Sequence, residues 1–362
     1  MANRSEAPAT HLHGSPDTPQ VRGSWLARGK DGRLSVYLPR NGGAVRWTEG
    51  ADGGWSGPEA IGGGSGGLLP SLSVGQGADG YVHLVGLRPV AGGEPDRVEL
   101  VHSTQYQTGR PALEWRSITH PNGAAFRWTG TPSVTVDGIG RAYVFCRNGG
   151  GGISVRAQKD AGGWHPWWDL LGSKTDPLPV AVTNGSGFVE LYSSHAAGLV
   201  RYVQRESGAK PLREELLPAP VTMGTMGAVR GPSGHVTAFY LDREGRVCAW
   251  SPERDLAPTP LVDAAGEGPL TVVRRPVDGV DHTLIAQRDA SGRVVFASYP
   301  AEREGARELR WSAPGPDVQG PPALRSDASG GVVAAAVAAG GEPIVARGKG
   351  GTDAAPGAWA RI

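Results

Sequence analysis

Short apolar stretches alternate with glycine-containing turns along almost the whole chain. One unit reads DG-RLSVY-LPRNGG-AVRW, and the same order of turn, strand, turn and strand occurs in seven places. The strands follow the pattern apolar, any residue, apolar, aromatic, as in Leu34, Val36 and Tyr37. Alternation with a period of two residues predicts β-strands with unlike faces. Glycine turns between such strands predict antiparallel hairpins.

The spacing of these turns predicts the architecture. The first glycine of each unit falls at Gly32, Gly80, Gly140, Gly187, Gly234, Gly279 and Gly330, at an average spacing of about 50 residues. An additional strand, often opened by proline, precedes each turn, and a more irregular fourth strand closes several units, such as LRWSAPGP in the sixth. Four short antiparallel strands repeated seven times predict an all-β protein, a seven-bladed β-propeller. How the ring closes is left open.

The predicted domain organisation is a single propeller after a flexible N-terminal tail. The tail comprises residues 1–20 and the propeller residues 21–362, with blades of approximately 21–66, 67–126, 127–175, 176–221, 222–265, 266–317 and 318–362.

Composition agrees with many turns in an ordered chain. The 57 Gly and 30 Pro are about a quarter of the 362 residues, and both residues disfavour helix interiors. Hydrophobic residues are 39%, there are 11 Trp, and the net charge is only +1, which is untypical of disordered chains. Neither nucleic acid nor a membrane is expected as a partner, because charge is balanced and apolar runs are short. The N-terminus lacks an apolar signal-peptide core, so a cytoplasmic location is expected unless a signal was trimmed.

The first unit resembles the repeat of the bacterial PLL-like and tectonin-like lectins. The resemblance lies in DGRLSVYLPRNGGAVRW and GGWSGPEAIGG, and GGWHPWWDLLGS retains Trp164 and Trp167. It implies a seven-bladed propeller that binds fucose or related sugars in pockets between blades, on aromatic platforms and polar side chains. The second Asp-Gly of the family pattern is only loosely kept, and the closing Trp pair is absent from units four, five and seven. This drift indicates few surviving pockets, or one asymmetric site at the channel mouth.

Candidate ligand-binding residues lie in the loops that join second to third strands, since these share one face of a propeller. They are Arg40, Asn41, Arg88, Arg147, Asn148, Asp242, Arg243, Arg288 and Asp289. Guanidinium, amide and carboxylate groups bind hydroxyls or carboxylates, although the same residues are ordinary in turns. Trp55 and Trp164 are candidates for sugar stacking or for wedges between blades. His195, in one of the same loops, is the candidate general acid or base of an enzyme.

Further charged residues are expected on the inner strands, where a water-filled channel tolerates them. They are Arg230, Arg274, Arg275, Arg325 and Asp137. No metal site and no cofactor are predicted, because the sequence has no CxxC, HExxH, Walker loop or helix-opening dinucleotide motif. Cys146 and Cys248 are expected to be buried thiols.

Three functions stay open at this point. The first is lectin-like binding of a carbohydrate or a similar small polar ligand through loops and pockets between blades. The alternative is a cytosolic enzyme of specialised metabolism, a cyclase, lyase or hydrolase, with one active site at the channel mouth. The third is a protein-interaction scaffold. The oligomeric state is not predicted.

Overall fold

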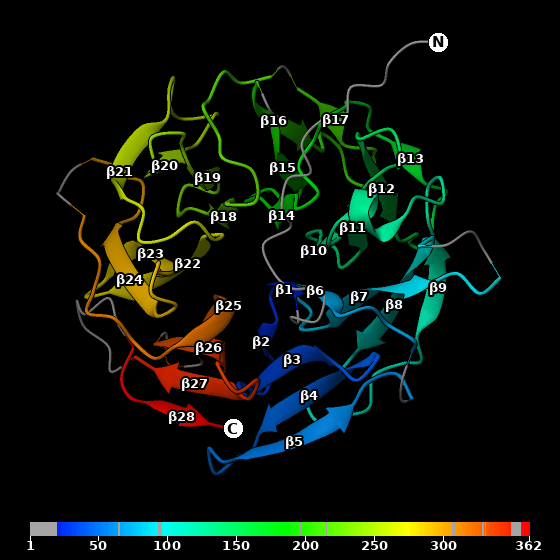
Figure 1. Cartoon of the computed structure of the whole chain (residues 1–362), viewed down its shortest axis with the longest axis horizontal. Coiled ribbons are helices and arrows are strands. Elements are labelled where there is room, and N and C mark those ends of the chain that lie inside the picture. The colour runs from blue at the N-terminus through cyan, green and yellow to red at the C-terminus, as the bar shows by residue number, and fades with distance from the viewer. Residues whose placement is uncertain are drawn as a thin grey trace.

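Seven antiparallel sheets surround a central channel in a computed structural model of the chain, as Figure 1 shows along the channel. The predicted all-β, seven-bladed propeller is confirmed. The structure describes residues 20–63, 66–92, 96–195, 197–214, 216–305, 309–327, 329, 331–348 and 356–362, without the side chain of residue 127. The proposed tail therefore lies outside the described residues up to position 19, and Gln20 already begins the first strand.

Each blade is built from the channel outwards, in the order of the chain. The inner strands of blades 1 to 7 are β2 (Leu26–Arg28), β6 (Ser71–Gln76), β10 (Ser133–Val136), β14 (Val180–Thr183), β18 (Gly227–Arg230), β22 (Thr271–Val277) and β25 (Val318–Ser326). The second strands are β3 (Leu34–Arg40), β7 (Val82–Pro89), β11 (Ala142–Arg147), β15 (Val189–His195), β19 (Val236–Leu241), β23 (Val280–Arg288) and β26 (Val332–Ala338).

The third strands are β4 (Gly43–Glu49), β8 (Val98–Gln105), β12 (Ile153–Ala157), β16 (Gly198–Val203), β20 (Arg246–Trp250), β24 (Val294–Pro300) and β27 (Pro343–Arg347). The outer strands of blades 1 to 5 and 7 are β5 (Trp55–Ala60), β9 (Arg116–Thr119), β13 (Trp168–Asp169), β17 (Leu212–Arg213), β21 (Thr259–Asp263) and β28 (Trp359–Arg361).

Blade 6 has three strands in the described residues. Its predicted outer strand, LRWSAPGP, runs beside β24 without a regular ladder: Ser312 N–H donates to the Phe296 carbonyl at 2.7 Å, and Ser312 Oγ accepts from Phe296 N–H at 3.1 Å. Pro314 and Pro316 lack the N–H groups that a ladder needs, which explains the missing strand.

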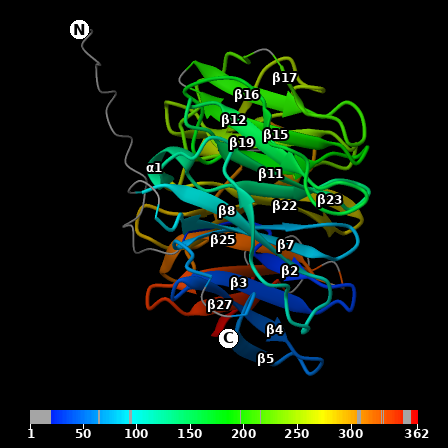
Figure 2. The ribbon, with the colours of Figure 1, turned by 90° about the vertical axis from the view of Figure 1, so that its right-hand side faces the viewer.

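The two faces of the ring carry different turns. We call the face with the second-to-third turns and the blade-to-blade connections the upper face, and the opposite one the lower face. A single helical turn, α1 (Phe126–Thr129), lies in the connection between blades 2 and 3, and Figure 2 shows it on the left-hand, upper face.

Glycine has a steric role in the lower-face turns. Gly185 N–H donates to the Gly234 carbonyl of the next blade at 2.8 Å, and Gly138 does the same to Gly187 at 2.9 Å. A Cβ on Gly185 would lie 2.5 Å from the Gly234 Cα. Close approach of two backbones, as well as turn conformation, therefore requires glycine here.

The hydrophobic core is divided among the seven interfaces between blades, which we call seams and number by the two blades. In seam 3/4, Tyr143 and Phe145 of β11 pack against Val189 and Leu191 of β15, and all four are fully buried. Alternate residues of each strand thus pack against the preceding blade and against the following blade. This is why the alternating pattern predicted the strands.

The ring closes at seam 7/1 without strand exchange. Blade 7 consists of β25 to β28, from the last part of the chain, and blade 1 of β2 to β5, from the first part, so neither sheet contains a strand from the other end. Ala335 and Val345 of blade 7 belong to the same apolar cluster as Val36 of blade 1. Arg347 forms an ion pair with Glu49 across the seam.

The N-terminal strand joins blades 1 and 2 instead. β1 (Gln20–Gly23) pairs in parallel with β6 of blade 2, and the same run continues as β2 of blade 1. Gly23 makes the crossing with a φ of 73°, where a Cβ would lie 2.2 Å from the Val74 carbonyl oxygen.

Candidate functional site

The structure places the predicted loop residues at the second-to-third turns of the upper face, where three of them support the turns. Asn148 Oδ1 accepts from the N–H groups of Gly150 and Gly152 at 3.0 and 3.1 Å. Asp242 and Asp289 accept N–H groups two and four residues later in the same way. Burial acts to raise the pKa of Asp242, but hydrogen bonds from the Arg246 backbone and guanidinium outweigh it and lower that pKa. These side chains have a structural role that accounts for their place in the repeat.

The other predicted upper-face residues are held in local contacts or stand exposed. Arg88 is paired with Glu99 at 2.6 Å, and Arg288 donates through Nε to the Val318 carbonyl at 2.7 Å. Arg40, Asn41 and Arg243 are exposed, and Arg243 also makes a contact of its own.

His195 and Arg147 have different surroundings. His195 Nδ1 accepts the Ala197 N–H at 3.0 Å, so this nitrogen stabilises a turn. The Arg147 guanidinium lies 5.8 Å from the Trp128 ring centre, and burial lowers its pKa. The described contacts do not join His195 and Arg147 to one another. Ligand contact by the upper-face residues stays a prediction.

Tryptophans hold neighbouring blades together. The indole N–H of Trp115 donates to the Ile61 carbonyl at 3.2 Å, that of Trp167 to Ile118 at 3.1 Å, and that of Trp311 to Asp263 at 2.8 Å. In each case the tryptophan belongs to the later blade and the carbonyl to the blade before it. The wedge interpretation therefore describes these three rings.

The two tryptophans singled out as sugar platforms also pack against protein groups. Trp55 is partly buried against the core cluster of seams 7/1 and 1/2. Trp164 meets the edge of His102, with ring centres 5.0 Å apart and planes at 81°.

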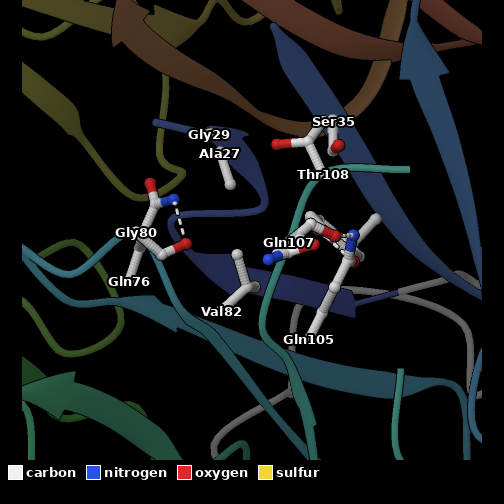
Figure 3. A pocket seen from close by; sticks show the side chains of 10 residues that line it. Ala27, Gly29, Ser35, Gln76, Gly80, Val82, Gln105, Gln107 and Thr108 are labelled. Carbon is white, nitrogen blue, oxygen red and sulfur yellow. Dashed lines mark hydrogen bonds between the residues drawn. The ribbon is translucent and has the colours of Figure 1, made fainter. Parts of the chain in front are cut away.

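A pocket lies in seam 1/2 and is bounded by lower-face turns (Figure 3). Its enclosed part has room for about one water molecule, and its mouth is open to solvent. Blade 1 contributes Ala27, Gly29, Ser35 and Tyr37, and blade 2 contributes Gln76, Gly80, Val82, Gln105, Gln107 and Thr108. The side chains are hydroxyls, amides and small apolar groups, and none of them is charged.

Hydrogen bonds fix the pocket wall. Tyr37 Oη donates to Gln105 Oε1 at 2.7 Å, and Gln105 Nε2 donates to the Gln107 carbonyl at 2.8 Å. Gln76 Nε2 donates to the Arg28 carbonyl at 2.8 Å. Burial raises the pKa of Tyr37 far above its ordinary value, so its hydroxyl keeps its proton. The Gln107 amide is exposed and makes no hydrogen bond among the described residues, so it is available to a ligand.

The same positions are filled in seam 4/5. Strand register makes Tyr37 and Arg46 of blade 1 equivalent to Tyr192 and Arg201 of blade 4, and Ser35 is therefore equivalent to Glu190. Arg201 donates to Glu190 through Nε at 3.0 Å and through a terminal nitrogen at 2.8 Å.

Two further carboxylates complete this network. Glu253, from blade 5, and Glu214 lie 2.8 and 3.1 Å from the Arg201 guanidinium, and Tyr192 Oη donates to Glu190 at 2.8 Å. Because Glu190 is fully buried among these partners, an ion-pair network occupies the space that is a pocket in seam 1/2.

Seam 2/3 has a third filling. His83 and His102 occupy the positions of Ser35 and Arg46, with Nδ1 of His83 3.0 Å from Nε2 of His102. Burial lowers the pKa of His83 to about 4. Burial and the His83 charge together lower that of His102 to about 3. Both rings are therefore neutral near pH 7, and Trp164 packs against His102.

Sequence reasoning did not select the pocket residues. The resemblance to PLL-like lectins implies pockets between blades, but the predicted ligand-binding residues lie in loops of the upper face. The available signal was the glutamine at the ends of two strands, Gln76 and Gln105, followed by Gln107. Among the described residues no cluster of three or more His, Cys, Asp or Glu could hold a metal ion. The described part of the chain also contains no helix with the length and apolarity to cross a membrane.

Comparisons with solved structures agree on the fold class. The BP39L lectin of Burkholderia pseudomallei superposes with a TM-score of 0.68 at 14% identity, over 96% of this chain and 99% of the lectin. A fucose-specific lectin of Aleuria aurantia gives 0.52 at 15% identity, over 82% and 96%. The Hadza microbial sialidase Hz136 gives 0.51 at 14% identity, over 83% and 70%.

At such identities the likeness shows a shared propeller fold. No family model and no curated protein matches the sequence, so the resemblance to the PLL-like family stays a prediction.

Proposed function

We propose that the chain is a lectin-like protein that binds a carbohydrate in the pocket of seam 1/2. The observation that supports this is the uncharged lining of hydroxyl and amide groups at a seam between two blades. Such groups both donate and accept hydrogen bonds, as sugar hydroxyls do. The enclosed part of the pocket has room for about one water molecule, so the ring of a neutral sugar would lie at the mouth with one of its hydroxyls inside the pocket.

The proposal includes one sugar site of this kind per chain. The equivalent space holds the ion-pair network in seam 4/5 and the histidine pair in seam 2/3. Similarity to lectin structures, one of them titled fucose-specific, supports the choice of a sugar, and L-fucose is the first candidate.

A glycan array followed by calorimetric titration tests the proposal, with L-fucose, galactose, mannose and glucose as free probes. We expect saturable binding with one site per chain. Gln107→Ala should weaken it about tenfold or more, since one pocket amide that can bond a sugar hydroxyl is lost. Glu206→Ala is the matched control, because Glu206 holds the same turn position in blade 4. Absence of sugar binding, or equal binding by both variants, would refute the proposal.

A further inference from the structure

The channel end at the lower face contains an arc of arginines that the sugar pocket does not use. Strand register defines one position that is equivalent in all seven blades. It is the residue of the inner strand that pairs near the start of the second strand. In blades 1 to 7 it is Arg28, Gln76, Val136, Thr183, Arg230, Arg274 and Ser326. Arg325 precedes Ser326 in blade 7. The strands β18, β22, β25 and β2, from blades 5, 6, 7 and 1, follow one another along one side of the channel (Figure 1), and each carries an arginine at or next to this position.

Among the described residues, the side chain at this position ties five of the seven blades to the blade before it, by donating a hydrogen bond to a backbone carbonyl there. The Thr183 hydroxyl donates to the Val136 carbonyl at 2.6 Å, and the Ser326 hydroxyl donates to the Arg274 carbonyl at 3.2 Å. Gln76 does the same with an amide. One neutral donor is thus sufficient for the tie.

Arginine provides more than the tie requires. Arg28 donates to the Asp327 carbonyl, and Arg274 to the Gly231 carbonyl at 3.3 Å. A guanidinium has five N–H donors and a permanent charge, so each side chain keeps donors and charge beyond the tie. A backbone carbonyl holds Arg28 and the amide of Gln76 holds Arg325, and neither partner neutralises the guanidinium charge.

The arc has more positive charges than there are nearby carboxylates to pair with them. Among the described residues, Arg28, Arg230 and Arg325 form no ion pair with a carboxylate, and Arg325 donates to Gln76 Oε1 at 2.8 Å. Burial and the neighbouring charge of Arg28 lower the pKa of Arg325, so two like charges lie close together at seam 7/1.

One nearby carboxylate pairs with the arc itself, because Asp281 lies 3.6 Å from Arg274. The other nearby carboxylates are engaged elsewhere: Asp327 accepts turn N–H groups and pairs with Arg347 at 3.5 Å. Glu302 accepts the hydroxyl and the N–H of Ser233.

We propose that this arc, Arg28, Arg230, Arg274 and Arg325, binds a polyvalent oxyanion at the lower end of the channel. Preorganised guanidinium groups recognise carboxylate, sulfate and phosphate oxygens with several charge-assisted hydrogen bonds. Several arginines from separate blades fit a ligand with two or more anionic groups better than a single ion. An acidic saccharide and a phosphorylated small molecule share this chemistry. The arc adjoins the neutral-sugar pocket through Gln76, which lines that pocket and accepts from Arg325, but the groups proposed to bind the anion are the arginines alone.

Titration of the full chain with inorganic triphosphate, and with a sulfated disaccharide and its unsulfated parent, tests the proposal. We expect one saturable site for at least one anionic probe, weakened by added NaCl because the attraction is electrostatic. Arg230→Gln and Arg325→Gln should each weaken binding about tenfold or more. Arg40→Gln, the same charge change on an exposed upper-face residue, should bind as the wild type does.

The variants separate binding from stability. The side chain of Arg230 makes no hydrogen bond among the described residues, so Arg230→Gln should leave the melting temperature of the free protein unchanged. The same variant should reduce the rise in melting temperature that triphosphate produces. Binding of triphosphate but of neither disaccharide would indicate a phosphorylated ligand. Binding of the sulfated disaccharide but not of its unsulfated parent would indicate an acidic glycan. Failure of both anions to bind, or equal loss in Arg40→Gln, would overturn the proposal whatever the outcome with neutral sugars.

Discussion

Seams 1/2 and 4/5 are built on the same positions and reach opposite results. Blade 1 places serine at position 35 and leaves a pocket, whereas blade 4 places the fully buried Glu190 at the equivalent position. The arginine is kept in both, as Arg46 and Arg201, and each pairs with a carboxylate thirteen residues later, Glu59 or Glu214. The residue at this position, together with the groups that the next blade supplies, therefore distinguishes the open seam from the sealed one. The predictions below challenge this comparison, in decreasing order of their effect on the free energy of unfolding.

Removing the arginine should have the largest effect in the sealed seam. Arg201→Met leaves Glu190 buried without its partner, and losing one member of a buried pair costs about 3–5 kcal/mol. Arg46→Met should cost less, because the carboxylate of its partner Glu59 is 51% exposed and can be hydrated. Urea unfolding of both variants measures the difference. Equal losses in the free energy of unfolding would show that the two arginines contribute equally to stability.

Seam 2/3 should begin to lose stability at a higher pH than seam 4/5, where the burial of Glu253 is outweighed by Arg201 and His235, which hold its pKa below the ordinary value. The pKa of His83 is lowered to about 4 and that of His102 to about 3, so between these values and about 6.5 the unfolded chain binds more protons than the folded one. Stability should fall as pH drops from about 6.5 towards 3, by on the order of 3 kcal/mol for His83.

Melting temperatures measured from pH 7 to pH 4 test this expectation. His83→Asn removes one titrating ring and should flatten the decline relative to the wild type. A variant with an unchanged slope would show that other groups, such as surface carboxylates, dominate the acid response.

A third change concerns the turns beneath the sealed seam. Gly185→Ala would place a Cβ 2.5 Å from the Gly234 Cα, and overpacking of this kind costs typically about 1–3 kcal/mol. In seam 1/2 a Cβ on Gly80 would meet the flexible side chain of Lys30 at 3.0 Å instead of another backbone. Gly268→Ala is the control, because no atom lies within 4 Å of its added Cβ. Equal free energies of unfolding for Gly185→Ala and Gly268→Ala, measured by chemical denaturation, would contradict the steric account.

The smallest effect on stability should come from converting the open seam into the sealed type. Ser35→Glu places a carboxylate where Glu190 lies in blade 4, next to Arg46, whose Nε is buried without a hydrogen-bond partner. The new pair should offset most of the cost of burial and change stability by roughly 1 kcal/mol or less. Sugar binding should be lost because the pocket is filled. Retained binding, measured by calorimetry beside the wild type, would place the sugar elsewhere.

The sequence was sufficient to predict the propeller because its determinants are local. Alternating strand residues and turn glycines such as Gly140 and Gly187 recur in every unit, and the observed positive φ angles confirm those that the structure describes. The outer strand of blade 6 was wrongly predicted, because Pro314 and Pro316 interrupt a segment that otherwise resembles its counterparts.

The pocket could not be derived in this way. Whether Ser35 faces open space depends on Gln76 and Gln105 of the next blade, some 40 to 70 residues further along the chain. The roles of Asn148 and Asp242 were equally ambiguous, since residues that brace turns are of the same types as residues that bind ligands.

Closure of the ring by side chains at seam 7/1 has a consequence for how such a chain can change over generations. Since the described strands of blade 7 all come from one continuous stretch, recombination that duplicates or deletes one unit of about 50 residues adds or removes an intact blade and leaves no half-built sheet at the ends. Blades 1 and 2 are the exception. The run through β1 and β2 belongs to both, so a recombination break between these two blades would separate β1 from the strand it pairs with.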